Sequence, residues 1–288
     1  MIPYAFQINK TDNDKKQHKF FVLVKVILFW AVFMGLLFLG GAFLVPKLPS
    51  AFSSLWYGLT GSLCAIIAIA IYLRSEKLTM LQAGLVWQPK TFIRFCTGFL
   101  IGTAILLLMI STLMIFTKLR FVRNTRFGDD WIVVIGYLAI IPLALMEELA
   151  FRSLAFVKLL NVFDIRVTQL IVAIAFALYH VVGGQDWISS FLGPGAWAFI
   201  FGLAAIRSGG IAMPLGLHVA ANMWQAVVGL THTDRAVFLP HFERSATNAV
   251  TQSTETLGMI MQLILLLTGL ALTEFYYRRR VHTTYKIG

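Results

Sequence analysis

The sequence is poor in charged residues. Asp, Glu, Lys and Arg make up 13% of its 288 residues, whereas a typical soluble domain contains about 25%. Hydrophobic residues make up 58%, and the mean hydropathy is +0.78. There are too few polar side chains to cover the surface of a water-soluble globular domain. The composition therefore predicts a polytopic membrane protein.

Cysteine is also scarce. Cys64 and Cys96 both lie in or beside apolar segments and form no CxxC pair, which argues against a disulfide framework and a cysteine metal site. We expect two free thiols. The net charge of +11 would suggest a nucleic-acid partner in a soluble protein, but here the basic residues cluster at the ends of apolar runs. The pattern predicts a lipid bilayer as the partner and no nucleic acid.

Three protease signatures are absent. The sequence has no HExxH, which argues against a zinc peptidase of the soluble type, and no GxGD, which argues against paired catalytic aspartates. Ser208 in Arg207-Ser208-Gly209-Gly210 lies at a helix end and lacks the GxSG-like turn of a rhomboid-like serine nucleophile. Repeat symmetry is missing too, which counts against a proton-coupled transporter.

Long apolar runs, in contrast, are abundant. The first follows a polar N-terminal tail, 1-19, and is longer than the roughly 7–15 apolar residues of a signal peptide, so we expect a retained span. The sequence predicts an all-α, polytopic transmembrane bundle of about eight helices in one domain, 20-277, followed by a basic C-terminal tail, 278-288. The expected spans are about 20-45, 51-73, 95-117, 131-160, 166-182, 191-206, 211-230 and 256-274.

Two connections carry further expectations. Segment 74–94 mixes basic residues with Leu and Trp, which indicates an interfacial helix and linker. An even number of spans places both termini on one side, and the Lys-rich N-terminal tail and the Arg triplet 278–280 both indicate the cytoplasm. The basic loop 118–130 disagrees with this orientation. We expect a multi-pass integral membrane protein with cytoplasmic termini, in the plasma membrane if the chain is bacterial.

A charged cluster interrupts span 131-160. Glu147, Glu148 and Arg152 lie inside this otherwise apolar run, where each charge is disfavoured by roughly 2.5–3.5 kcal/mol. Glu148 and Arg152 are four residues apart and can form an intrahelical ion pair. Glu147 points about 100° away around the helix and is the better candidate for acid or base chemistry. The alternative is a purely structural charge network that fixes helix packing.

Two histidines are placed to join this cluster. His180 and His218 are the histidines inside spans, and Glu147 and His180 are equally distant from the break at 161–164. In an antiparallel helical hairpin, this spacing puts the two side chains at similar depth. Asn222 follows His218 by four residues, so both lie on one face of their helix. We expect these side chains to meet.

With these residues, the sequence resembles the CPBP family of intramembrane endopeptidases, also called the CAAX protease and bacteriocin-processing or Abi family. The resemblance covers about 131-229, a core motif region that holds three motifs in order. These are Glu147-Glu148-x-x-x-Arg152, Phe176-x-x-x-His180 and His218-x-x-x-Asn222.

The resemblance implies a conical intramembrane catalytic cavity and a glutamate-dependent mechanism. It implies that Glu147 and His180 activate a water, that His218 and Asn222 stabilise the oxyanion, that Glu148 and Arg152 support them, and that Phe176 walls the site. No cofactor or metal is expected; a divalent metal ion, if bound, would use Glu147, His180 and His218.

The resemblance further implies a hydrolase that cuts a membrane-associated or prenylated, CAAX-type protein or peptide. The membrane protein or lipidated peptide would be its substrate partner, and the sequence predicts no particular oligomeric state. The alternative of another class is a non-proteolytic membrane scaffold or regulator, or a bacteriocin-immunity protein, of the same fold.

Overall fold

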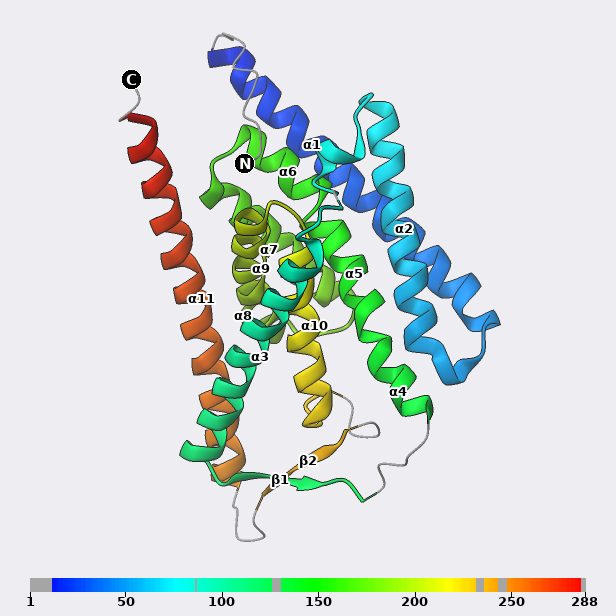
Figure 1. Ribbon diagram of the computed structural model, residues 1–288, viewed down its shortest axis with the longest axis vertical. Coiled ribbons are helices and arrows are strands. Elements are labelled where there is room, and N and C mark those ends of the chain that lie inside the picture. The colour runs from blue at the N-terminus through cyan, green and yellow to red at the C-terminus, as the bar shows by residue number, and fades with distance from the viewer. Residues whose placement is uncertain (1–11, 86, 126–130, 232–235, 243–247, 286–288) are drawn as a thin grey trace.

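The computed structural model describes residues 12–85, 87–125, 131–231, 236–242 and 248–285, and these residues are mostly helical (Figure 1). The helices are α1 Asp12–Leu39, α2 Ser53–Ser75, α3 Thr91–Phe116, α4 Trp131–Leu138, α5 Ile140–Phe151, α6 Leu154–Val162, α7 Ile165–Val182, α8 Trp187–Leu192, α9 Pro194–Ser208, α10 Ala212–Val227 and α11 Asn248–Tyr285. The predicted helical bundle is confirmed, with the addition of one small sheet.

Seven segments of the described chain are long and apolar enough to cross a membrane. The remaining expected span, 211-230, corresponds to helix α10, which has sixteen residues, or roughly 24 Å by helix rise, and packs against α3, α5 and α9. The chain is a multi-pass membrane protein. The seven segments are His18–Lys47, Ser50–Ser75, Thr91–Phe116, Val133–Val162, Ile165–Val182, Trp187–Ser208 and Ser253–Arg279.

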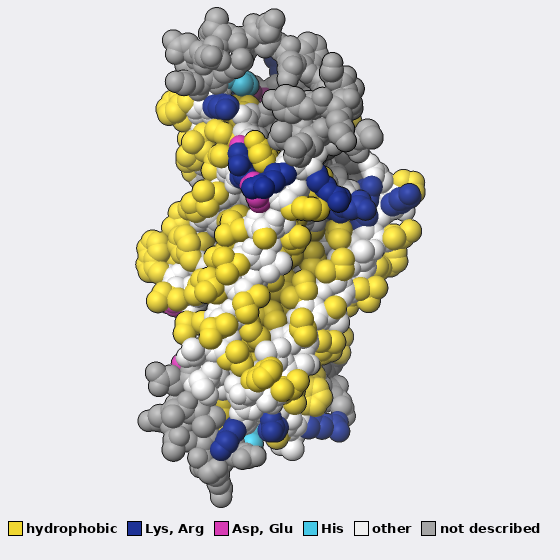
Figure 2. Space-filling model, turned by 90° about the vertical axis from the view of Figure 1, so that its left-hand side faces the viewer, with side chains coloured by type: hydrophobic (Ala, Val, Ile, Leu, Met, Phe, Trp, Pro, Cys, Tyr) yellow, Lys and Arg dark blue, Asp and Glu magenta, His cyan; other side chains and the backbone are white. Residues whose placement is uncertain are grey.

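The first helix begins and the last helix ends at the same end of the bundle. Helix α1 begins and helix α11 ends at the top of Figure 1, and the sheet lies at the bottom. Figure 2 shows hydrophobic side chains over the middle of one face, with Lys and Arg side chains gathered near both ends. This distribution fits a bilayer around the middle of the bundle.

The fourth expected span is confirmed as a candidate membrane span, Val133–Val162, but it is not the continuous helix that we had predicted. It consists of α4, α5 and α6, separated at Ala139 and at Arg152-Ser153. Near the first break, Pro142 has no N–H for the carbonyl four residues earlier. At the second, Ser153 leaves the helical region (φ −94°, ψ −116°) and its hydroxyl donates to the Leu149 carbonyl. Helix α5 therefore ends directly after the charged cluster.

The interfacial helix expected in segment 74–94 is also absent from the described residues between α2 and α3. These residues contain a 3-10 turn, Met80–Ala83, which Thr79 and Gln82 cap reciprocally. Gly84 ends the turn at φ 74°, a left-handed conformation that glycine adopts without strain. Pro89 follows closely and lacks the N–H that a continuing helix would need.

The sheet pairs two segments that we had assigned to loops. Strand β1 Leu119–Arg123 runs antiparallel to β2 Phe238–Phe242, with Leu119 opposite Phe242 and Arg123 opposite Phe238. It thereby ties the connection between α3 and α4 to the connection between α10 and α11 (Figure 1).

Glycines let an outer helix approach one that bears the motifs. A Cβ atom on Gly98 of α3 would overlap the Met213 carbonyl of α10, and one on Gly216 of α10 would overlap the Phe95 carbonyl of α3. The Trp224 indole N–H also donates to Thr103 Oγ1 across the same pair, at 3.1 Å. Helix α3 thus fixes the position of α10 at backbone contact.

Candidate active site

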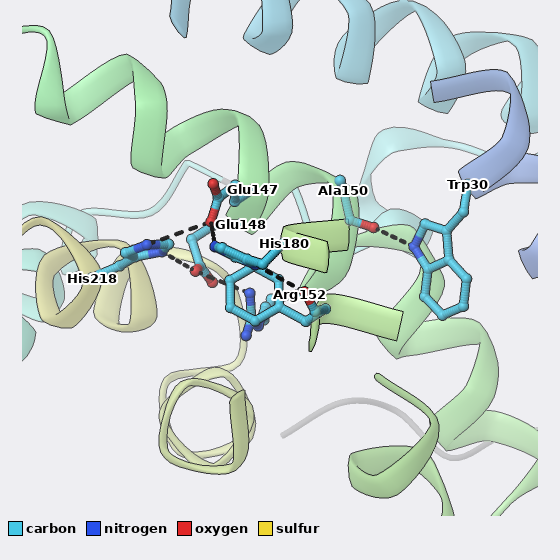
Figure 3. A network of polar contacts seen from close by, with 8 residues as sticks. Trp30, Glu147, Glu148, Ala150, Arg152, His180 and His218 are labelled. Carbon is cyan, nitrogen blue, oxygen red and sulfur yellow. Dashed lines mark hydrogen bonds and ion pairs between the residues drawn. The ribbon is translucent and has the colours of Figure 1, made fainter. Parts of the chain in front are cut away.

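Three helices bring the central motif residues together. Glu147 comes from α5, His180 from α7 and His218 from α10, and their side chains converge in Figure 3. Glu147 Oε2 lies 3.5 Å from His218 Nε2 and 4.0 Å from His180 Nε2. The Glu147, His180 and His218 side chains are 13%, 22% and 7% exposed, so the cluster is largely buried.

The first turn of α7 is held by Asp164. Its carboxylate accepts hydrogen bonds from the backbone N–H groups of Arg166 (2.9 Å) and Val167 (3.1 Å), as an N-cap does. Partial burial alone would raise the pKa of the Asp164 carboxyl, but the hydrogen bonds from Val167 and Arg166 hold that pKa below its ordinary value. The cap fixes where the helix carrying His180 begins.

The tautomer of His180 follows from its contacts. Its Nδ1 lies 2.9 Å from the Phe176 carbonyl oxygen, which can only accept, so Nδ1 carries a proton. In the neutral ring, Nε2 then holds a lone pair directed towards Glu147. A separation of 4.0 Å between Glu147 Oε2 and His180 Nε2 is too long for a direct hydrogen bond. It suits a water that donates one proton to each acceptor.

His218 is oriented by the second glutamate. Its Nδ1 donates to Glu148 Oε1 at 2.8 Å, which leaves Nε2 facing Glu147 Oε2. With Nδ1 protonated, Nε2 presents an N–H only when the ring is an imidazolium. The buried Glu148 carboxylate fixes the orientation of the ring, as a carboxylate bonded to the distal nitrogen of an imidazole does in serine hydrolases.

Arg152 contacts the same oxygen of Glu148 that binds His218. Its guanidinium lies 3.4 Å from Glu148 Oε1, and neither side chain is exposed. It packs over the rings of Phe176, at 4.0 Å, and Phe201, at 5.0 Å, in cation–π contacts that a desolvated site strengthens. Phe201 also stacks on the His218 ring at 4.7 Å. Arg152, Glu148 and the two aromatic rings thus pack together beside the His218 ring.

Several polar atoms of the cluster lack hydrogen-bond partners among the described residues. They include Glu147 Oε2, Glu148 Oε2 and the Nε and Nη2 atoms of Arg152. Buried polar atoms without partners cost free energy and are uncommon in native proteins. Their concentration at one place is typical of a site that binds water or substrate.

Two outer helices brace α5 at both of its ends. The Trp30 indole of α1 donates to the Ala150 carbonyl at 3.0 Å (Figure 3), and Ser62 of α2 donates to the Pro142 carbonyl at 3.0 Å. The Ala150 carbonyl lies in the last turn of α5, where carbonyls have no partner within the helix. Together the two contacts hold the segment that carries both glutamates.

Six of the seven predicted site residues are joined by polar or ring contacts, and Asn222 makes none of these contacts. Asn222 lies one turn beyond His218 on α10, is partly exposed, and its side chain forms no hydrogen bond with another described residue. The six that lie together are Glu147, Glu148, Arg152, Phe176, His180 and His218. Their catalytic roles stay predictions.

Metal binding was the alternative for the glutamate and histidine set. Within the described ranges, no group of three His, Cys, Asp or Glu side chains has an arrangement that could hold a metal ion. The expectation that no metal is needed stays a prediction.

Sequence reasoning missed three aromatic contributors. Phe201 stacks on His218, Trp30 caps α5, and Tyr179 stacks on Phe176 at 6.4 Å. Each lies in an apolar helix where an aromatic side chain more often serves packing. The sequence holds no signal that separates these three from the other aromatic residues.

The motif region matches a known family. Residues 129–224 match the model of the Rce1-like type II CAAX prenyl endopeptidases. The match runs from the start of α4 into α10 and covers the site residues from Glu147 to Asn222. No curated protein matches the chain.

Proposed function

We propose, from the premise that residues 129–224 form an Rce1-like type II CAAX prenyl endopeptidase domain, that the chain is an intramembrane endopeptidase that uses Glu147 as its general base. One observation carries this proposal. The buried Glu147 Oε2 has no hydrogen-bond partner among the described residues and lies between the Nε2 atoms of two histidines.

The first step is the activation of water. A water between Glu147 Oε2 and His180 Nε2 donates to both, which directs an oxygen lone pair towards the substrate. As the oxygen attacks the scissile carbonyl, Glu147 accepts a proton from it. Positioned bases of this kind accelerate reactions by typically 10²–10⁴-fold. Phe176 fixes the His180 ring through its carbonyl and packs edge-on against it at 4.7 Å.

The second step is stabilisation of the tetrahedral oxyanion. The imidazolium form of His218 donates from Nε2 to the oxyanion, while Glu148 holds the proton on Nδ1. Asn222, with a free amide one turn away, is the second donor. Loss of one such donor typically lowers the rate by about 10²–10³. Glu147 then returns its proton to the leaving amine, which completes the hydrolysis of the peptide bond.

The membrane setting bears on the substrate. The site lies within a bundle of helices that expose large hydrophobic side chains outward, so we propose a membrane-associated or prenylated protein or peptide as substrate, reached through an intramembrane cavity. The Lys-rich N-terminal tail and the Arg triplet 278–280 favour cytoplasmic termini. We propose no cofactor.

Peptide cleavage by the purified protein in lipid tests this proposal. Wild type and Glu147→Gln are offered a mixture of prenylated and unprenylated peptides, and the fragments are read by mass spectrometry. We expect new fragments from wild type and a loss of about 10³ in rate for the variant, with unchanged thermal unfolding.

Glu274→Gln is the matched control, since it makes the same chemical change on the exposed end of α11. It should cleave as wild type does. Fragments at equal rates from Glu147→Gln would remove Glu147 from the mechanism. No fragments from folded wild type across a broad peptide set would favour the non-proteolytic scaffold. An added chelator should leave the rate unchanged.

A further inference from the structure

The small sheet has features that the hydrolysis described above does not use. It lies at the end of the bundle opposite the start of α1 and the end of α11 (Figure 1). Lys118, Arg120 and Arg123 are exposed there, and Val122 is 43% exposed. Neither strand contains an acidic residue. The strand β1 therefore presents a basic, accessible surface.

The pairing shows which side of β1 is free. The Asn124 N–H donates to the Val237 carbonyl at 2.9 Å, directly after the strands. In an antiparallel pair, the backbone groups of alternate residues face the partner strand. Since Asn124 faces β2, Phe121 and Arg123 direct their N–H and C=O groups away from it. Neither residue has another backbone hydrogen bond within the described part of the chain.

Leu119 faces away from β2 as well, but its backbone is satisfied. Its N–H donates to Thr117 Oγ1 at 3.1 Å, and its carbonyl accepts from the Arg120 guanidinium at 3.0 Å. The open part of the edge is therefore limited to Phe121 and Arg123. It offers the donors and acceptors of one short extended segment.

The other edge of the sheet is closed. Pro240 lies at the centre of β2, opposite Phe121, and proline has no N–H to donate. Its position on the side away from β1 agrees with the pairing of Asn124. The sheet thus has one blocked edge and one open edge, whereas proteins usually protect both.

The open edge is fixed relative to a site-bearing helix. Gly229 follows α10 with φ 68°, and a Cβ atom there would lie 3.1 Å from Ala236 Cβ and 3.1 Å from the Phe238 carbonyl. The Asn124 side chain also donates to the Ala236 carbonyl at 2.9 Å. The sheet therefore packs against the end of the helix that carries His218 and Asn222.

We propose that the outer edge of β1 binds an extended, acidic segment of the polypeptide substrate as a third strand. The backbone groups of Phe121 and Arg123 supply the strand pairing, a recognised mode of peptide binding. The exposed cations Lys118, Arg120 and Arg123 select acidic side chains. Since its occupant is a substrate, this inference rests on the proposed endopeptidase function.

Peptide binding to the Glu147→Gln protein in lipid nanodiscs tests the edge without turnover. The probes are fluorescent peptides of one extended sequence, in an acidic and a basic version. We expect tighter binding of the acidic peptide, weakened by added salt. Phe121→Pro removes the outward N–H, which points away from β2, and should weaken binding about fivefold.

Phe121→Ala is the matched control, because it removes the ring and keeps the N–H. It should bind more tightly than Phe121→Pro. A second measurement needs no change in the protein: methylation of alternate backbone nitrogens of the peptide should weaken binding in one register and not in the other. Equal binding by the proline and alanine variants, no preference for the acidic peptide, or no binding of either peptide would each overturn the proposal.

Cleavage separates this inference from the proposed function. If wild type and Phe121→Pro both cleave peptides with the same KM, the proposed endopeptidase function stands and the proposed substrate-binding edge is wrong. A wild type that binds the acidic peptide through Phe121 and cuts no peptide retains a binding edge and loses the endopeptidase.

Discussion

Two clusters of acidic and basic side chains differ in their surroundings. The inner cluster joins Arg152 and Glu148, which are both 0% exposed, and the outer one joins Arg166, Glu274 and Arg278, whose side chains are 37–72% exposed. The outer contact between Arg278 and Glu274 is shorter, at 2.7 Å, than the inner one, at 3.4 Å. We therefore expect the burial of an ion pair, and not its length, to determine how much stability is lost when one partner is removed.

The reason lies in what happens when a partner is removed. At the surface, water replaces the missing partner, so an exposed pair adds little to stability. In the interior, the remaining charge has no solvent and must be neutralised or exposed. The inner pair also holds His218, whereas the outer one joins the ends of α7 and α11.

The largest effect is expected for the inner cluster. Arg152→Ala leaves the buried Glu148 carboxylate without its cation and should destabilise the protein by about 3–5 kcal/mol. Thermal unfolding followed by tryptophan fluorescence in lipid or detergent measures this. Replacement of both Arg152 and Glu148 by Leu should recover part of the stability without recovering peptide cleavage. A loss below about 1 kcal/mol for Arg152→Ala would place the pair with ordinary surface contacts.

The next largest effect concerns the packing of uncharged residues, again compared between a tightly packed and an open position. Gly98→Ala introduces a Cβ that overlaps the Met213 backbone in α10, and such overpacking should cost about 1–3 kcal/mol. Gly258 in α11 has no atom within 4 Å of the same added Cβ. Gly258→Ala should therefore leave the unfolding temperature unchanged or raise it. Equal effects at the two glycines would show that α3 and α10 adjust freely.

A smaller effect is expected at Asp164, which caps α7 outside the membrane-spanning segments. Asp164→Ala should cost about 1 kcal/mol at neutral pH. Because the pKa of Asp164 is lowered in the folded state, its contribution is present above the unfolded pKa and is lost as the pH falls through the folded pKa.

The difference between wild type and Asp164→Ala should therefore shrink in acid, as measured by unfolding at pH 7 and near pH 3. Asp164→Asn keeps a capping oxygen without the charge, so it should remain close to wild type at neutral pH. A difference that grows in acid would contradict the lowered pKa.

The smallest effect belongs to the outer cluster. Glu274→Gln removes the partner of Arg166 and Arg278 in an exposed position, where water compensates. We expect no measurable change in unfolding temperature and none in peptide cleavage, in the same assays. A clear loss of stability would mean that the ends of α7 and α11 are held by this pair and not by apolar packing.

The sequence was sufficient for the parts of the fold that the membrane constrains. A span needs about 20 apolar residues, so the bundle is readable from composition. The depth match of Glu147 and His180 followed from their spacing around the break at 161–164, and the structure places them 4.0 Å apart. The pairing of Glu148 with Arg152 followed from their separation by four residues, and they are in contact.

Other features depend on contacts that no local pattern carries. Ser153 breaks the fourth span without a proline or glycine beside it. The bond from His218 to Glu148 joins residues 70 apart and shows the second glutamate to be a direct partner of the histidine, and not only of Arg152. The five-residue strands β1 and β2 lie in connections more than 100 residues apart. Each strand is too short for its sequence pattern to predict its partner.

The distant pairing of β1 with β2 also sets an order of events during synthesis. Residues 119–123 leave the ribosome early, and their partners, residues 238–242, appear only after the whole of α4–α10 has been made. Pairings between such distant segments form late, because the intervening chain must first be ordered. The sheet therefore forms only after the segment that includes every proposed catalytic residue has been made. A nascent chain that ends before β2 cannot form it.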